Sequence, residues 1–254
     1  MANTNSAILN VMVATVEKAG RALTRDFGEV EQLQVSRKGP NDFVSSADKK
    51  SEKIIREELE KVRPNFSFIM EESGKIEGTD KDNVWIVDPL DGTLNFLHGI
   101  PHWCISVALQ TKGEIVAAVI HDPIKHETFT AEKGKGAFST AKRLRVSGRK
   151  TLAEALLAIS GQKLREKIIT SSDTKNRNMG CACLNMAYVA AGRFDAYCED
   201  KLESWDKAAG YLIVKEAGGY VSEIDGGKNP IYGKGVIAAN PHMHEVIVAK
   251  LGER

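Results

Sequence analysis

The segment Trp85-Ile86-Val87-Asp88-Pro89-Leu90-Asp91-Gly92-Thr93 decides how this chain is interpreted. Its apolar first half predicts a buried strand. Pro89 cannot donate a ladder hydrogen bond and Gly92 permits a tight turn, so the strand should end here. The end of the strand would then present two carboxylates and a hydroxyl. Carboxylates that share a site repel each other, and hard divalent cations such as Mg²⁺ relieve that repulsion. The alternative is a polar turn in which the aspartates only accept hydrogen bonds from the backbone.

Two other acidic positions extend this argument. Glu71 follows the strand-like residues 66–70 and stands just before a break at Ser73-Gly74. Asp206 stands where a helix over about 206–217 should begin. Taken singly, Glu71 is typical of a solvated loop and Asp206 of an ordinary helix N-cap. A metal site requires that the fold bring these carboxylates together.

The first half of the chain predicts two helices followed by a series of strands. The first helix should end near Phe27, with Gly28 as its terminator, and the second should begin at Ser45 or Ser46 and stop before Pro64. Strands are expected at 66–70, 84–87, 104–110, 114–121 and 127–131, with a hairpin turn at Gly113.

The pattern changes to alternating strands and helices after about Ser147. Strands are expected at 155–160, 195–198, 220–222 and 236–239, and helices at 184–191, at 206–217 and after Asn240, with Pro241 in the first turn. The predicted class is therefore α/β. We expect an α+β domain over 1–147 that carries most of the acidic site, and an α/β domain over 148–254 that carries Asp206.

Composition excludes several classes of protein. The 254 residues include 35 Lys and Arg against 34 Asp and Glu, a net charge of +1, so there is no basic field and nucleic acid is not an expected partner. No apolar run approaches the roughly 20 residues that span a bilayer, and the N-terminus lacks the pattern of an export signal. We expect a cytoplasmic protein with no membrane segment. Its four cysteines should be reduced thiols, and because Cys181 and Cys183 lack a second pair nearby in sequence, burial is favoured over a soft-metal site.

Four separate motifs together resemble the inositol monophosphatase family. They occur in the family's order and cover nearly the whole chain: Met70-Glu71-Glu72-Ser73, Trp85 to Phe96, Trp205-Asp206-Lys207-Ala208-Ala209-Gly210 and Glu216-Ala217-Gly218-Gly219. The resemblance implies a layered α-β-α-β-α sandwich of the sugar phosphatase type. It also implies two or three Mg²⁺ ions per subunit, inhibition by lithium and a homodimer.

The resemblance assigns roles to individual positions. Its metal ligands are Glu71, Asp88, the main-chain carbonyl of Leu90, Asp91 and Asp206. Its catalytic residues are Asp48, Thr93 and Glu71, with Asp48 as the acid that partners the Thr93 hydroxyl. Its substrate contacts are Asp91, Gly92, Thr93, Gly180, Cys181, Ala182, Glu199 and Asp206. On sequence alone, Asp48 is also typical of a capping box begun by Ser45, and residues 180–182 are also typical of plain helix packing.

The chain departs from the family pattern in two places. Residues 156–177 are fewer than usual, which leaves little room for the helix that normally precedes the Gly-x-Ala segment. Cys181 stands where the family commonly has a small hydroxyl residue, which removes a good hydrogen-bond donor near the substrate. A basic residue near the third metal position is expected at Arg37 or Lys38.

These observations predict Mg²⁺-dependent hydrolysis of a phosphate monoester, with inositol 1-phosphate as the expected substrate, through in-line attack of a metal-activated water. Within the same superfamily the alternatives are phosphatases of 3′-phosphoadenosine 5′-phosphate, fructose 1,6-bisphosphate and NADP. A haloacid-dehalogenase chemistry is disfavoured because two residues, not one, separate Asp88 from Asp91. An alternative of another class is a regulatory protein that binds the transcription machinery.

Overall fold

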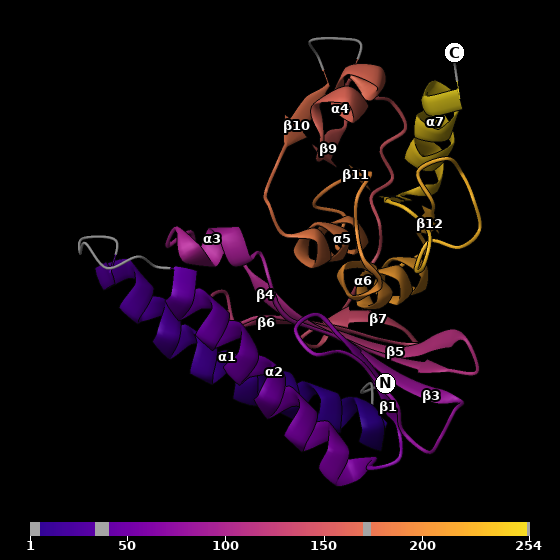
Figure 1. The fold of residues 1–254 in the computed structure, drawn as a ribbon. Coiled ribbons are helices and arrows are strands. Elements are labelled where there is room, and N and C mark those ends of the chain that lie inside the picture. The colour runs from indigo at the N-terminus through magenta and orange to yellow at the C-terminus, as the bar shows by residue number, and fades with distance from the viewer. Residues whose placement is uncertain (1–5, 34–40, 170–173, 253–254) are drawn as a thin grey trace.

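The computed structural model describes residues 6–33, 41–169 and 174–252. They form two β-sheets and three layers of helices (Figure 1). The first sheet has eight strands in the order β2-β1-β3-β4-β5-β6-β7-β8, and it is antiparallel except where β1 pairs with β3. Its strands are β1 (Ser67–Met70), β2 (Gly74–Ile76), β3 (Asn83–Asp91), β4 (Cys104–Thr111), β5 (Glu114–Asp122), β6 (Glu127–Glu132), β7 (Gly136–Ser139) and β8 (Lys142–Arg143).

Two long helices, α1 (Ala7–Leu33) and α2 (Asn41–Val62), cover the outer face of this sheet. Residues Met12, Val16, Ala19 and Leu23 recur at helical spacing along one side of α1 and are buried. They pack against the sheet in a core that includes Trp85. This packing supports the outer face of β3, the strand that carries Asp88 and Asp91.

The second sheet has five strands in the order β10-β9-β11-β13-β12. They are β9 (Leu156–Ile159), β10 (Lys175–Arg177), β11 (Ala196–Glu199), β12 (Tyr220–Ser222) and β13 (Val236–Ala239). Helices α5 (Ala182–Ala190) and α6 (Ser204–Glu216) lie between the two sheets, and α4 (Gln162–Ile168) and α7 (Pro241–Gly252) lie beyond the second sheet. A short helix, α3 (Thr93–Leu97), follows β3. The predicted α-β-α-β-α sandwich is therefore confirmed.

Several predicted boundaries are also confirmed. Lys112 and Gly113 have φ values of 51° and 83° in the turn between β4 and β5, which makes the expected hairpin. The side chain of Asn240 accepts a hydrogen bond from the Met243 N–H at 2.9 Å and caps α7, whose first residue is Pro241. The change of sheet lies between Arg143 and Leu156. The division into domains 1–147 and 148–254 remains a prediction, because one apolar core in the middle layer draws residues from both halves.

Other predicted boundaries are wrong. Helix α1 continues through Gly28 to Leu33 because buried Val30 extends its apolar side, which outweighs the cost of about 1 kcal/mol for a helical glycine. Helix α2 begins at Asn41, not at Ser45 or Ser46. Strand β3 runs through Pro89 to Asp91, with an irregularity in its pairing between Asp88 and Asp91 that accommodates the proline.

The 156–177 region also differs from expectation. It holds helix α4 and strand β10, so a short helix does fit before the 180–182 segment. Arg37 and Lys38 lie outside the described residues. Within the described part of the chain, no helix is both long and apolar enough to cross a bilayer.

Candidate active site

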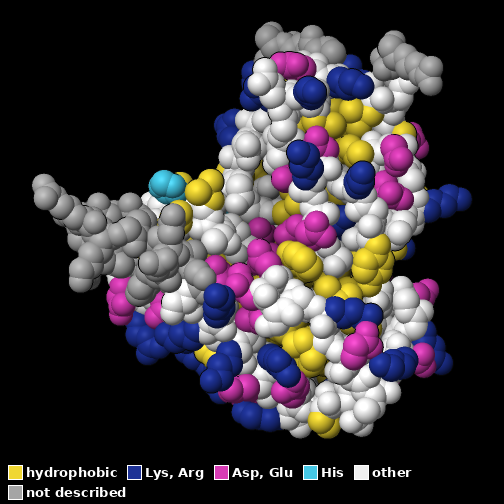
Figure 2. Space-filling view, in the orientation of Figure 1, with side chains coloured by type: hydrophobic (Ala, Val, Ile, Leu, Met, Phe, Trp, Pro, Cys, Tyr) yellow, Lys and Arg dark blue, Asp and Glu magenta, His cyan; other side chains and the backbone are white. Residues whose placement is uncertain are grey.

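Three carboxylates from distant parts of the chain meet where β3 ends and α6 begins. Asp88 and Asp91 lie on β3, Asp206 lies in the first turn of α6, and one oxygen from each lies within 4.8 Å of the other two. Figure 2 shows acidic side chains gathered across the middle of the molecule, between the layer of α5 and α6 and the first sheet. The fold thus brings together three of the predicted metal ligands.

Burial raises the pKa of all three carboxyls, and the charges of neighbouring acids add to the shift of Asp88 and Asp206. Desolvation raises the pKa of Asp88 well above its ordinary value, and the charges of Asp91 and other nearby acids act in the same direction. Desolvation, followed by the charge of Asp91, raises the pKa of Asp206 to about 7. Burial also raises the pKa of Asp91, although hydrogen bonds from Cys181 and Cys183 oppose this. Such a group of acids is costly to ionise unless cations are bound beside it.

Glu71 and Asp48 extend the cluster toward β1 and α2. Burial raises the pKa of the Glu71 carboxyl, and a hydrogen bond with Asp88 acts in the opposite direction. Asp48 is 5% exposed, and its Oδ1 is buried without a hydrogen-bond partner among the residues that the structure describes. Burial, followed by the charges of Glu72 and Glu71, raises the pKa of Asp48 to about 7. A buried carboxylate oxygen without a hydrogen bond is unfavourable, and such an atom is typical of a position that binds a ligand.

Within the described residues, the Thr93 hydroxyl does not donate the predicted hydrogen bond to Asp48. The Thr93 hydroxyl donates instead to the carbonyl of Leu90 at 2.9 Å. The capping-box interpretation of Asp48 is wrong, because α2 begins seven residues earlier, at Asn41. Asp206 does belong to a capping box, since its Oδ2 accepts a hydrogen bond from the N–H of Glu203, the N-cap of α6, at 2.7 Å.

Asp91 is held from its inner side by the start of α5. Its Oδ2 accepts hydrogen bonds from the Cys183 N–H at 2.6 Å and the Cys181 thiol at 3.1 Å, and its Oδ1 accepts one from the Ala182 N–H at 3.2 Å. The 180–182 segment therefore lies directly against the acidic cluster. Because the Ala182 N–H donates a hydrogen bond to Asp91, this N–H helps to orient the Asp91 carboxylate.

Two glycines in this region have left-handed backbones. Gly92, with φ of 91°, precedes α3, and a Cβ there would lie 3.0 Å from the carbonyl oxygen of His102. Gly180 has φ of 68° and lies against the amide of Asn95. The Asn95 Nδ2 donates to the carbonyls of Met179 at 2.8 Å and His102 at 2.7 Å. Sequence reasoning gave Asn95 no role, although it ties α3 to the segment before α5.

Glu199 ends β11 on the other side of the cluster. Burial raises the pKa of its carboxyl, and the charge of Asp91 is among the further causes. The Tyr197 hydroxyl donates to its Oε2. A cavity of about 570 Å³ lies next to this strand end, and Glu203 and Asp206 are among the residues that line it. The cluster therefore borders a space large enough for a small molecule.

Comparison with known proteins agrees with this arrangement. The family model described as "Inositol monophosphatase family" matches residues 4–254. The chain belongs to the inositol monophosphatase family. It is 50% identical over 252 residues to an inositol-1-monophosphatase of Rhizobium meliloti, with 95% of each chain covered. It is 38% identical over 254 residues to the Nus factor SuhB of Escherichia coli, with 96% of this chain and 95% of that protein covered.

Solved structures of this family share the fold. The crystal structure of the extragenic suppressor protein suhB from Bartonella henselae superposes with a TM-score of 0.89 at 47% identity and covers 98% of this chain and 99% of that one. The inositol monophosphatase of Thermotoga maritima superposes with a TM-score of 0.84 at 32% identity, with 98% of each chain covered.

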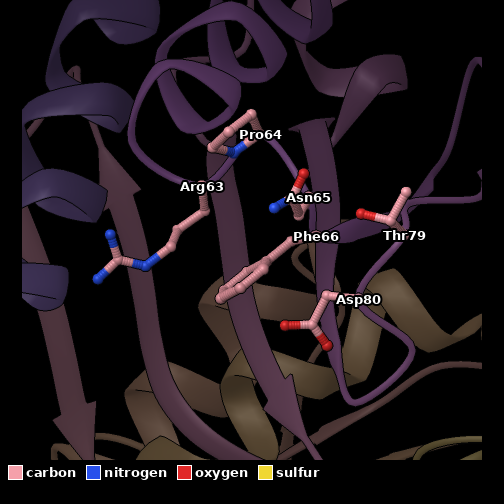
Figure 3. A pocket seen from close by; sticks show the side chains of 6 residues that line it. All are labelled: Arg63, Pro64, Asn65, Phe66, Thr79 and Asp80. Atoms are coloured by element: carbon pink, nitrogen blue, oxygen red, sulfur yellow. The ribbon is translucent and has the colours of Figure 1, made fainter.

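A second cavity lies away from the cluster. It has a volume of about 320 Å³ and is formed where α2 connects to β1, around Pro64 and Phe66 (Figure 3). Asp80 is the one acidic side chain among the described residues that line it. This hollow lacks the convergent carboxylates of the family's site, so we assign it no role in catalysis.

Proposed function

We propose that this chain hydrolyses phosphate monoesters with the help of Mg²⁺, and that inositol 1-phosphate is its substrate. The observation that carries the proposal is the meeting of Asp88, Asp91 and Asp206 beside a cavity, in a chain of the inositol monophosphatase family. The 50% identical relative named an inositol-1-monophosphatase supports the choice of substrate.

The donor set suits Mg²⁺, which prefers oxygen ligands and above all carboxylates. The proposed ligands of two or three ions are Glu71, Asp88, the Leu90 carbonyl, Asp91 and Asp206. When bound, Mg²⁺ lowers the pKa of water and stabilises charge on the phosphate and the leaving oxygen. With Asp48 included, the five carboxylates carry −5 when ionised, and three Mg²⁺ bring +6, so the loaded site is near +1 and can receive a phosphate dianion.

The chain's own groups orient the reaction. The Thr93 hydroxyl lies at the end of β3 beside the Leu90 carbonyl, where it would position the attacking water. Asp48, whose buried Oδ1 has no hydrogen-bond partner in the described part of the chain, would accept the proton of that water. Asp91 is held in one orientation by three donors from the start of α5, so the substrate meets a carboxylate that needs no reorganisation.

Substrate contacts are proposed on both sides of this centre. Gly92 and Thr93 follow Asp91 directly, and Cys181 and Ala182 donate hydrogen bonds to its carboxylate, so both segments border the acidic cluster. We propose that Gly92, Thr93 and residues 180–182 contact the phosphate from this position. Asp91 and Asp206 would contact the phosphorylated alcohol from the metal side. Oε2 of Glu199 accepts a hydrogen bond from the Tyr197 hydroxyl, and Oε1 would accept one from a substrate hydroxyl.

We further propose a cytoplasmic homodimer that is inhibited by lithium. Leu94 and Ile100, which are 67% and 48% exposed, place apolar surface on and just after α3, where a second copy of the chain could bind. Sedimentation velocity tests this directly: Leu94→Asp should shift a dimer toward monomer. A wild-type protein that sediments as a monomer at all concentrations would contradict the dimer.

Release of phosphate tests the function. Inositol 1-phosphate should be hydrolysed with Mg²⁺ and not in EDTA, and it should be preferred over 3′-phosphoadenosine 5′-phosphate, fructose 1,6-bisphosphate and NADP. Asp88→Asn should retain the circular dichroism spectrum and lose nearly all turnover. Full activity of this variant at ordinary Mg²⁺ would overturn the assignment. If the same variant still performs the chain's cellular role, the regulatory alternative suggested by the SuhB relative is favoured.

A further inference from the structure

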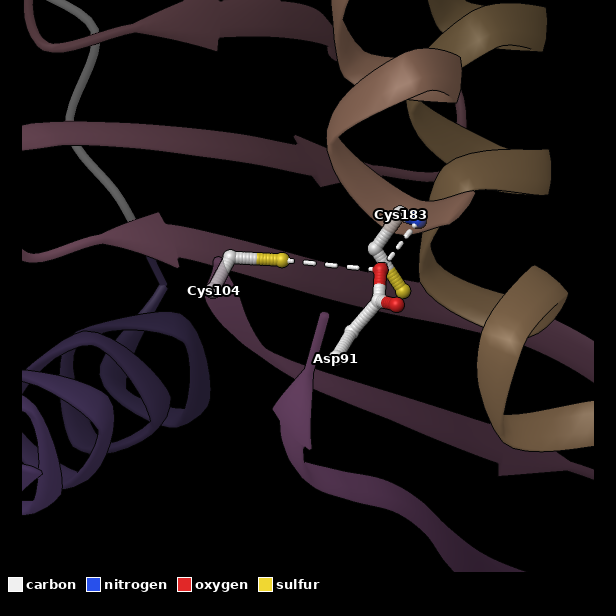
Figure 4. A group of neighbouring side chains, drawn as sticks. All are labelled: Asp91, Cys104 and Cys183. Atoms are coloured by element: carbon white, nitrogen blue, oxygen red, sulfur yellow. Dashed lines mark hydrogen bonds between the residues drawn. The ribbon is translucent and has the colours of Figure 1, made fainter. Parts of the chain in front are cut away.

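Two cysteines far apart in sequence meet on the inner side of Asp91. Cys104 is the first residue of β4 and pairs in register with Asp91 on β3, while Cys183 lies in the first turn of α5. Both are fully buried and free. One ligand atom from each of Asp91, Cys104 and Cys183 lies within 4.8 Å of the other two, and Figure 4 shows the Cys104 thiol directed toward the carboxylate, with the Cys183 side chain beside it. The Cys183 thiol also donates a hydrogen bond to the carbonyl of Asp206 at 3.3 Å.

A third thiol adjoins this group. Cys181 Sγ lies 3.6 Å from Cys104 Sγ and 3.1 Å from Asp91 Oδ2, and Cys104 Sγ lies 3.8 Å from the same oxygen. In a tetrahedral zinc site with Zn–S of about 2.3 Å and Zn–O of about 2.0 Å, the sulfurs lie about 3.8 Å apart and an oxygen about 3.5 Å from a sulfur. The spacing of Cys104, Cys181 and Asp91 is therefore close to that of a sulfur-and-oxygen metal site, and Cys183 offers a further sulfur within 4.8 Å of Cys104 and Asp91.

We propose that a carboxylate oxygen of Asp91 and the sulfurs of Cys104 and Cys183 bind one soft or borderline divalent cation, such as Zn²⁺ or Cd²⁺. On binding, the two thiols each release a proton and become thiolates, so the ion and its three ligands carry −1 in total. The Cys181 sulfur is the nearest source of a fourth ligand. This site differs in chemistry from the neighbouring group of Asp88, Asp91 and Asp206, which offers oxygen ligands only and suits hard cations.

Because the two sites share Asp91, a soft cation bound at the thiols should affect the binding of Mg²⁺ at the carboxylates. Oxygen Oδ2 of Asp91 faces the thiols of Cys104 and Cys181 and the Cys183 N–H. A cation held there draws the carboxylate inward and adds positive charge beside the position proposed for Mg²⁺. Soft cations should therefore compete with Mg²⁺ although the two sites have only the Asp91 ligand in common.

Titration of the metal-free full-length protein with Cd²⁺ tests the inference, because cadmium–thiolate bonds give an ultraviolet charge-transfer band that Mg²⁺ cannot give. The expected result is a band that saturates at one ion per chain. Cys104→Ser and Cys183→Ser should each lower the affinity by about tenfold or more, since even outer partners of metal ligands contribute that much. Cys198→Ser is the matched control, because Cys198 is also fully buried but lies in the outer core of the second sheet. It should titrate like the wild type.

Absence of the band in the wild type overturns the proposal without any variant. So does a band that survives in both Cys104→Ser and Cys183→Ser, or one that is lost equally in Cys198→Ser. Circular dichroism of each variant shows that it is folded before titration. The readout is absorbance and not turnover, so failure of the proposed phosphatase function leaves this result unaffected.

Discussion

Replacement of Asp206 by Asn should stabilise the metal-free protein. The folded chain raises the pKa of Asp206 from 3.8 to about 7, first by burial and then through the charge of Asp91. The unfolded chain releases this proton near pH 4, whereas the folded chain keeps it until about pH 7. The free energy of unfolding therefore falls as pH rises through this interval, and the full penalty applies above pH 7.

The size of the effect follows from the shift. A difference of about 3 pKa units at about 1.4 kcal/mol each gives a penalty of about 4 kcal/mol at pH 8. Asparagine removes the charge but keeps an oxygen that can accept the Glu203 N–H, so the capping box of α6 is retained. The variant should thus be more stable than the wild type by up to about 4 kcal/mol at pH 8 in EDTA, and the difference should vanish near pH 4.

Urea unfolding at both pH values, with and without Mg²⁺, measures this. Mg²⁺ should stabilise the wild type strongly and the variant much less, because a ligand stabilises only the state that binds it. Asp195→Asn is a control of opposite sign: this buried carboxylate has a cationic partner, Arg149 Nε at 2.8 Å, and its neutralisation should cost about 1–3 kcal/mol. An Asp206→Asn variant less stable than the wild type at pH 8 in EDTA would refute the electrostatic reasoning.

Three further outcomes are expected. Thr93→Ala should lower kcat much more than it raises KM, whereas Thr93→Ser should keep most activity; a change confined to KM would mean that Thr93 only binds ground-state substrate. Gly180→Ala should reduce the free energy of unfolding by about 1–2 kcal/mol, because φ is 68° and the Asn95 amide lies 3.3 Å from the new Cβ. An unchanged midpoint of urea unfolding would contradict the left-handed conformation of Gly180. Asn95→Ala leaves the carbonyls of Met179 and His102 without this donor and should lower the free energy of unfolding by about 1–3 kcal/mol in the same assay. An unchanged free energy of unfolding would contradict the stabilising role of Asn95.

Local signals in the sequence were sufficient for the elements that local chemistry determines. The Lys112-Gly113 turn and the Asn240 cap depend on residues within three positions of each other, and both are present in the structure. The ends of α1 and α2 depend on packing. Helix α1 continues past Gly28 because Val30 is buried. The preference of Ser45 and Ser46 for helix N-caps does not determine where α2 begins, since that depends on how the helix packs on the sheet.

The site shows the same division. The carboxylates could be identified from their motifs, but their surroundings depend on contacts between residues as far apart in sequence as 77 positions (Cys104 and Cys181) and 118 positions (Asp88 and Asp206). Cys104 meets Cys181 across such a distance, so the sequence argument that Cys181 and Cys183 lacked a neighbouring thiol could not include it. The Thr93 hydroxyl was expected beside Asp48 and instead donates to Leu90, because a partner three residues away in the same turn lies closer.

A crystal soaked in Mn²⁺, with diffraction recorded at the manganese edge, tests the central claim most directly. Mn²⁺ takes the same oxygen ligands as Mg²⁺ and reveals its position by anomalous scattering. We predict peaks within about 2.3 Å of carboxylate oxygens of Asp88, Asp91 and Asp206, with Glu71 on the neighbouring ion. An anomalous map with no peak among these side chains, at a concentration that supports phosphate release, would contradict the account.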